Sequence, residues 1–122
     1  MDITTEEEHR AWRGILKAQE MTYRTASSDG WYKNPETGED VVALMHSELS
    51  EALEAYRKEL MDDNLPHRNG IQAEFADCVI RILDTANTMG IDMADALIAK
   101  NRYNAIRADH KLSARAAGGK KY

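Results

Sequence analysis

The sequence predicts an all-α fold with four helices. Apolar residues recur at helical spacing in four segments, and no segment alternates between apolar and polar residues as a half-buried strand does. Both prolines, Pro35 and Pro66, fall between these segments among residues that favour turns. The 122 residues are enough for one domain with a modest core, which we expect to span residues 1–110. A basic C-terminal tail, residues 111–122, follows it.

The first predicted helix begins at Thr5, because Thr5 and Glu8 have the spacing of a capping box. Its apolar stripe consists of Trp12, Ile15, Leu16 and Tyr23. The next segment, from Ser27 to Gly38, is rich in turn formers and is predicted to be a loop. This loop presents two aromatic residues, Trp31 and Tyr32.

The second predicted helix runs from about Glu39 to Met61, where a turn-forming segment that ends in Pro66 interrupts the pattern. We expect its apolar stripe to face the core. The stripe consists of Val42, Met45, Leu49, Ala52, Leu53, Tyr56 and Leu60.

The third predicted helix is apolar around most of its circumference and is expected to be central. Asn69 is its predicted N-cap, and Gly90 suits the left-handed residue that commonly ends a helix. Its stripe consists of Ile71, Phe75, Cys78, Val79, Ile82, Ala86 and Met89. Asp92 is then predicted to cap a fourth helix that runs to about Ala108.

Charge and composition disfavour several classes of function. The net charge is −5 and basic residues gather only in the tail, which is not typical of a protein that binds nucleic acid polymers. No apolar run approaches the roughly 18 residues of a membrane span, and the acidic N-terminus does not resemble a signal peptide. The single cysteine, Cys78, cannot form an internal disulfide, which favours a reducing cytoplasm and a buried packing role.

Two nine-residue stretches, 45–53 and 71–79, align without a gap, and both carry two acids three residues apart beside an apolar stripe. The first pair is Glu48 and Glu51, and the second pair is Glu74 and Asp77. On helices, the two pairs lie at the same angle to their stripes. If the stripes pack together, four carboxylates meet at one edge of the contact, where they repel each other unless a cation lies between them.

The ligand types favour Mg²⁺ or Mn²⁺ at this edge, because all candidate ligands are carboxylate oxygens. A helical di-iron site would need histidines at the positions of Glu51 and Asp77, so iron is disfavoured. The alternative is a solvated acidic edge, which is the usual role of a single pair of acids. Two pairs in matched positions favour the metal site.

One face of the fourth predicted helix begins with apolar residues and ends with cationic and amide groups: Met93, Leu97, Lys100, Asn104 and Arg107. Such groups suit a bound phosphate, and salt bridges to the acids are the alternative. Arg81 is expected to neutralise Asp77 or Asp84 rather than to contact a phosphate. Trp31 or Tyr32 either stacks on a nucleobase or folds back on the core.

The two acid pairs, separated by the 22 residues from Ala52 to Ala73, resemble the signature of the MazG-like, all-α nucleotide pyrophosphohydrolases. That superfamily also holds dimeric dUTPases and dCTP pyrophosphatases. The likeness covers roughly residues 30–110 and extends to Lys100 and to Tyr103-Asn104-x-x-Arg107. It implies a four-helix MazG-like bundle that assembles as a homodimer or as a dimer of dimers.

The resemblance also implies Mg²⁺-dependent hydrolysis of nucleoside triphosphates to nucleoside monophosphate and pyrophosphate. The four acids would be the metal ligands and catalytic residues, and Lys100, Asn104 and Arg107 would hold phosphate or sugar. Trp31 or Tyr32 matches the place of a base-stacking aromatic. Arg81 departs from the family, whose members often carry an aromatic or aliphatic residue there. The alternatives are a non-catalytic helical module that binds a nucleotide or a partner helix, and a purely structural dimer.

Overall fold

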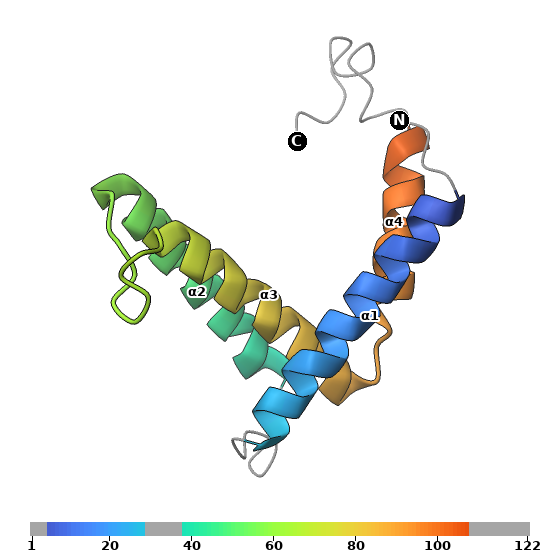
Figure 1. Cartoon of the computed structure of the whole chain (residues 1–122), viewed down its shortest axis with the longest axis horizontal. Coiled ribbons are helices and arrows are strands. Elements are labelled where there is room, and N and C mark those ends of the chain that lie inside the picture. Colours follow the sequence, from blue (N-terminus) through green and yellow to red (C-terminus); the bar gives the residue numbers. More distant parts are fainter. Residues whose placement is uncertain (1–4, 29–37, 108–122) are drawn as a thin grey trace. The chain divides into compact units, whose positions relative to one another are not determined.

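A computed structural model of the chain describes residues 5–28 and 38–107 (Figure 1). These residues form four α-helices and no β-strand, which confirms the all-helical prediction. The helices are α1 (Thr5–Ser28), α2 (Gly38–Lys58), α3 (Gly70–Met89) and α4 (Met93–Ile106). None of the helices in this part of the chain has both the length and the apolar composition that crossing a bilayer requires. The boundary predicted at residue 110 lies outside the described residues.

The chain divides into two compact units. The unit Ala18–Ile91 contains the second half of α1 together with α2 and α3. The other unit, Met1–Lys17 with Asp92–Tyr122, contains the first half of α1 and α4. The four acids of the two predicted pairs all lie in the unit Ala18–Ile91.

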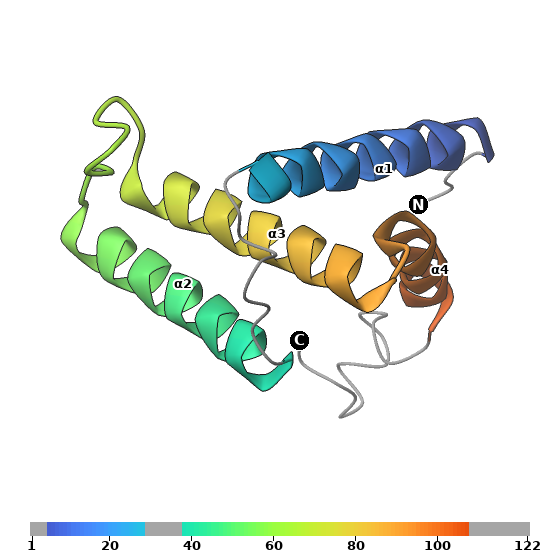
Figure 2. The same ribbon diagram turned by 90° about the horizontal axis from the view of Figure 1, so that it is seen from below.

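Helices α2 and α3 form an antiparallel hairpin, and they lie side by side in both ribbon views (Figures 1 and 2). Small residues line the contact between them. Ala52, Ala55 and Cys78 are buried, and the Cys78 thiol lies 4.0 Å from the carbonyl oxygen of Met45. At Gly70, an added Cβ would lie 2.8 Å from the Cβ of Ala55. The two helices therefore approach closely, as ridges of small side chains allow.

Most large side chains of the two predicted core stripes lie at the surface, so that part of the prediction is wrong. Ala52, Cys78 and Ala86 are buried, and Met45 and Ile71 are half-buried. The small residues form the contact line, and the large ones flank it. The exposed members of the stripes are Val42, Leu49, Leu53, Tyr56, Leu60, Phe75, Val79, Ile82 and Met89. The sequence pattern identifies an apolar sector on each helix but not which part of that sector contacts the neighbouring helix.

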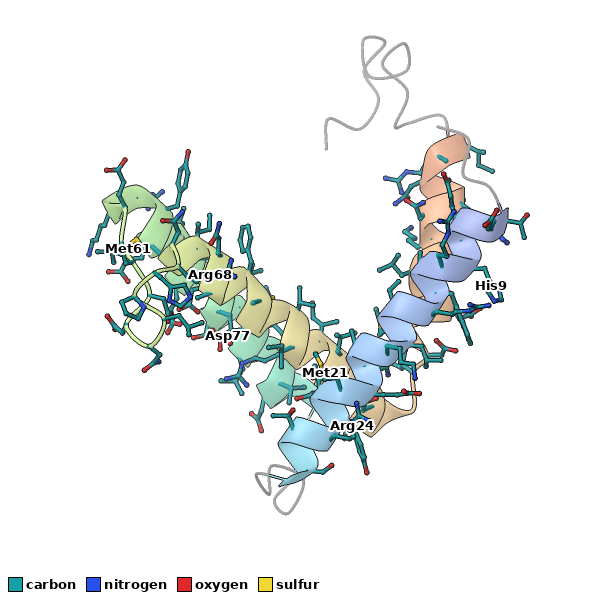
Figure 3. The ribbon with its side chains drawn as sticks, in the orientation of Figure 1. His9, Met21, Arg24, Met61, Arg68 and Asp77 are labelled. Atoms are coloured by element: carbon teal, nitrogen blue, oxygen red, sulfur yellow. The ribbon has the colours of Figure 1, made fainter. Side chains whose placement is uncertain are left out.

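Helix α2 ends at Lys58 rather than at the predicted Met61. Glu59 adopts a left-handed conformation with φ of 53°, and the amide of Leu60 donates a hydrogen bond to the carbonyl of Ala55 at 3.0 Å. This geometry is a usual way to end a helix, although glycine more often takes the left-handed position. Met61, which is labelled in Figure 3, then pairs with Asn69 in an isolated β-bridge at the connection to α3.

Hydrogen bonds connect the second half of α1 to the end of α3. Gln19 and Thr22 are buried on α1. The side-chain amide of Asn87 donates to the carbonyl of Gln19 at 3.0 Å, and the side-chain amide of Gln19 donates to the carbonyl of Ile91 at 2.9 Å. Gly90 ends α3 with φ of 70°, which confirms its predicted left-handed role.

The predicted helix caps have mixed outcomes. Asp92 caps α4 as predicted, because its side chain accepts the amide of Asp95 at 3.0 Å. Asn69 occupies the N-cap of α3, but its side chain forms no capping hydrogen bond. Glu8, predicted to complete a capping box, forms an ion pair with Arg102 of α4.

Gly70→Ala is expected to lower the free energy of unfolding by about 1–3 kcal/mol, the usual effect of an overpacked site. The new Cβ would lie 2.8 Å from the Cβ of Ala55 and 3.1 Å from the carbonyl oxygen of Leu60. Urea denaturation followed by circular dichroism measures the change. The matched control is Gly14→Ala on α1, where the added Cβ meets nothing within 4 Å. Equal effects at the two positions would contradict close packing at Gly70.

Candidate metal centre

The packing of α2 on α3 brings together acids from both predicted pairs. Glu48, Glu74 and Asp77 each place one carboxylate oxygen so that these oxygens all lie within 4.8 Å of one another. Glu48 precedes the buried Ala52 by one helical turn, and Glu74 precedes the buried Cys78 by one turn. The acids therefore flank the line along which the helices approach most closely. Figure 3 labels Asp77 on α3.

Glu51, the fourth predicted ligand, is exposed at the rim of this group. It lies close enough to Glu74 to raise the pKa of the Glu74 carboxyl. We refer to Glu48, Glu51, Glu74 and Asp77 together as the acid cluster. The structure thus brings three of the four predicted residues within ligand spacing of one another and places the fourth beside them.

Glu74 has the most strongly perturbed carboxyl of the acid cluster. Burial, contact with the carboxylates of Glu48 and Glu51, and their negative charges raise the pKa of Glu74 from 4.5 to about 8. Its Oε2 atom is buried and accepts no hydrogen bond. A buried carboxylate oxygen without a donor is unfavourable unless a proton or a cation is bound to it.

Asp77 also has a raised pKa. Burial is the main cause, followed by the negative charges of Glu48, Asp62 and Glu51, while the charge of Arg81 acts in the opposite direction. Asp62 lies in the α2–α3 connection, where its Oδ2 atom accepts the amides of Asn64 and Leu65 at 3.0 and 2.6 Å. Asp62 is not among the site residues predicted from the sequence. Its spacing to Asn64 indicates a turn, but nothing in the sequence places that turn near the acid cluster.

Arg81 forms an ion pair with Glu48, with 2.8 Å between its Nε and the Oε1 of Glu48. The Glu48 side chain is only 12% exposed. Burial is the largest single influence and opposes its charged form, but the hydrogen bonds with Arg81 and Glu74 and the charge of Arg81 together outweigh burial and lower the pKa of Glu48. The charge of Arg81 also favours the ionised form of Asp77, as expected, but the ion pair with Glu48 across the helices was not expected. Arg81 is half-buried on α3, which allows its guanidinium to reach α2.

The donor set of the acid cluster fits a hard divalent cation. It consists of carboxylate oxygens from two helices, and the buried Oε2 of Glu74 has a free lone pair. Mg²⁺ and Mn²⁺ prefer such ligands, whereas zinc prefers nitrogen and sulfur. One arginine faces four acids, so a divalent cation would balance the charge that Arg81 leaves uncompensated.

The candidate phosphate-binding residues lie on α4, in the other unit. Lys100 and Asn104 line one hollow on the surface of α4 together with Met93, Ala96, Leu97 and Asn101. The Nζ of Lys100 lies 5.0 Å from the centre of the Tyr103 ring, and the guanidinium carbon of Arg107 lies 5.7 Å from it. That this face meets the acid cluster stays a prediction. Trp31 and Tyr32 lie outside the described residues.

In metal-free protein, thermal stability is expected to fall as the pH rises from about 5 to about 8. The folded state keeps the proton of Glu74 up to a pKa of about 8, whereas the unfolded chain loses it near 4.5. The stabilisation is therefore complete below pH 4.5 and is lost as the pH rises through the folded pKa. Melting curves in EDTA across this range measure the slope.

Glu74→Gln is expected to flatten this slope, although Asp77 and Asp84, whose pKa values are also raised, leave part of it. The control is Glu54→Gln, an exposed acid of α2 that pairs with Lys58. This control should keep the slope of the unaltered chain. A slope that Glu74→Gln leaves unchanged would contradict the raised pKa.

Comparison of the chain with protein-family models, with curated proteins and with solved structures found no match. The resemblance to the MazG-like pyrophosphohydrolases therefore stays a hypothesis carried by the spacing of the acids and by the residues of the fourth helix.

Proposed function

We propose that this chain is a Mg²⁺-dependent pyrophosphohydrolase that converts nucleoside triphosphates to nucleoside monophosphate and pyrophosphate, with Mn²⁺ as an alternative cation. One observation carries the proposal: the carboxylate oxygens of Glu48, Glu74 and Asp77 converge within 4.8 Å from two helices. These three acids are also among the residues that carry the resemblance to the MazG-like superfamily. Sequence pattern and geometry thus support a single proposal.

The acids have separate tasks in this proposal. Glu48, Glu74 and Asp77 would hold the cation. A bound divalent cation neutralises phosphate oxygens and lowers the pKa of a coordinated water. Glu51 lies at the exposed rim beside Glu74 and is our candidate for the acid that orients the attacking water. No nucleophilic side chain is required, which agrees with the burial of Cys78.

The substrate would be held by cationic and amide groups. Lys100, Asn104 and Arg107 suit the phosphate oxygens and the sugar, because lysine and arginine pair with phosphate and asparagine forms directional hydrogen bonds. The base would stack on Trp31 or Tyr32. The proposal includes a homodimer or homotetramer, as the resemblance implies. It also includes a location in the cytoplasm, which the single cysteine favours.

Mg²⁺ or Mn²⁺ is expected to raise the melting temperature of EDTA-treated protein. A ligand that binds only the folded state stabilises it, by about 2.7 kcal/mol at a concentration of 100 times Kd. Glu74→Gln and Asp77→Asn should lose most of the response, since each removes a carboxylate oxygen from the acid cluster. Glu54→Gln, outside the cluster, should keep it. A purely structural role for the acids predicts no response in any of these proteins.

Incubation with a panel of NTPs and dNTPs plus Mg²⁺ is expected to release nucleoside monophosphate and pyrophosphate from at least one substrate. Chromatography of the nucleotides with a pyrophosphate assay identifies the products. Glu48→Gln, Glu74→Gln and Asp77→Asn should each lower kcat/KM more than about a hundredfold, because a cation site stabilises the transition state by several kcal/mol. Circular dichroism verifies that the variants fold.

Three outcomes would contradict the proposal. Release of diphosphate and orthophosphate would indicate cleavage at a different bond. Full activity in all three variants would contradict the assigned ligands. Nucleotide binding without products at saturating Mg²⁺ and Mn²⁺ would favour the non-catalytic helical module.

A further inference from the structure

The acid cluster has a fixed cation at one end. On α3, Glu74, Asp77 and Arg81 follow one another at spacings of three and four residues and therefore share one flank of the helix. On the antiparallel α2, Glu51 contacts Glu74. Glu48 lies one turn earlier on α2 and pairs with Arg81. The order along this flank of the hairpin is thus acids first and the guanidinium of Arg81 last.

Arg81 acts on an acid of each helix. Its Nε atom lies 2.8 Å from the Oε1 atom of Glu48 on α2. On its own helix, its positive charge favours the ionised form of Asp77, one turn earlier. A metal ion held between two helices acts on their carboxylates in the same way. The guanidinium keeps its charge at every pH at which the chain is folded, and its covalent attachment prevents it from leaving.

Burial makes this ion pair stronger than a surface pair. The side chains of Glu48 and Arg81 are only 12% and 26% exposed. A carboxylate with so little access to water needs a positive partner, and Arg81 supplies one to Glu48. At the other end of the cluster, the buried Oε2 atom of Glu74 accepts no hydrogen bond. Arg81 therefore compensates one end of the acid cluster and leaves the other end uncompensated.

We propose that Arg81 takes the place of a second cation in the acid cluster, so that the cluster binds one divalent ion per chain. The inference rests on the metal centre of the proposed function and adds the number of ions and its cause. Two pairs of acids offer enough carboxylates for two ions. The ion pair with Arg81 already occupies Oε1 of Glu48, and Glu51 is exposed outside the group of three convergent oxygens.

Electrostatics supports a single ion. A second divalent ion at Oε1 of Glu48 would lie against the guanidinium of Arg81, and the two positive charges would repel each other. One divalent ion together with Arg81 brings three positive charges to the four carboxyl groups of the cluster. Two divalent ions together with Arg81 would bring five, so the cluster would carry an excess of positive charge.

Manganese binding to the full chain tests the inference, because free Mn²⁺ gives an electron paramagnetic resonance signal that decreases on binding. The unaltered chain, freed of metal with EDTA and then dialysed, is expected to bind one Mn²⁺ per chain. Arg81→Met is expected to bind two, because Glu48 is then a buried carboxylate without its cation. Arg81→Lys keeps the positive charge and should bind one.

Lys58→Met is the matched control. It removes one positive charge and one ion pair from the same hairpin, since Lys58 pairs with Glu54 at 2.7 Å, but both side chains are more than half exposed. It should still bind one Mn²⁺, with a dissociation constant within about twofold of that of the unaltered chain, because exposed pairs contribute little. In EDTA, Arg81→Met should lower the melting temperature more than Lys58→Met does. That second measurement requires no bound metal.

The outcomes separate this inference from the metal centre on which it rests. An unaltered chain that binds no Mn²⁺ would contradict the metal centre and the inference with it. An unaltered chain that binds two would leave the metal centre in place and overturn the inference alone. Arg81→Met that binds one ion, as tightly as the unaltered chain or less tightly, would also overturn it. Should Arg81→Met fail to fold by circular dichroism, Arg81→Gln removes the same charge and carries the same expectation.

Discussion

The close contact between α2 and α3 is the interaction on which the other features depend. Ala52, Ala55 and Cys78 are buried along it, and Gly70 has no room for a Cβ because Ala55 would lie 2.8 Å away. The separation of packed helices follows from the side chains at their contact. Larger residues on this line would move the helices apart, and the side chains of Glu48 and Asp77 would no longer reach a common point. The metal-centre hypothesis therefore depends on residues that carry no charge.

This contact brings carboxylates close enough to repel each other, and the ion pair with Arg81 offsets only part of that repulsion. Four acids gather at one flank, and the single cation paired with them in the described residues is Arg81, 2.8 Å from Glu48. Glu74 has the most strongly raised pKa of these acids, about 8, and its buried Oε2 atom accepts no hydrogen bond. A group of like charges held together at a cost in stability is typical of functional sites. A proton on Glu74 or a divalent cation relieves the same repulsion, so the two are expected to compete.

The sequence predicted the four helices because apolar periodicity and end signals are local properties. Asp92 and Gly90 act as predicted because each needs only its own neighbouring turn. Convergence of the acids was predictable because both pairs have the same phase relative to their stripes. The end of α2 was not, because Glu59 takes a left-handed conformation that glycine usually takes. The partner of Arg81 was also missed, since it depends on which residues of α2 lie opposite α3.

The hairpin has an acidic flank and an apolar flank, and the small residues at the helix contact lie between them. The stripes were expected to be buried as a whole, yet only their small residues form the contact. In a helix, residues on either side of a contact position point to opposite flanks. An acid placed before Ala52 and an apolar residue placed after it therefore separate an acidic flank from an apolar flank within three residues. On α3, Asp77 and Val79 lie on either side of the buried Cys78 in the same way. A short repeated pattern thus specifies both an acidic flank and an apolar flank, and the small residues between the two flanks set the distance between the helices.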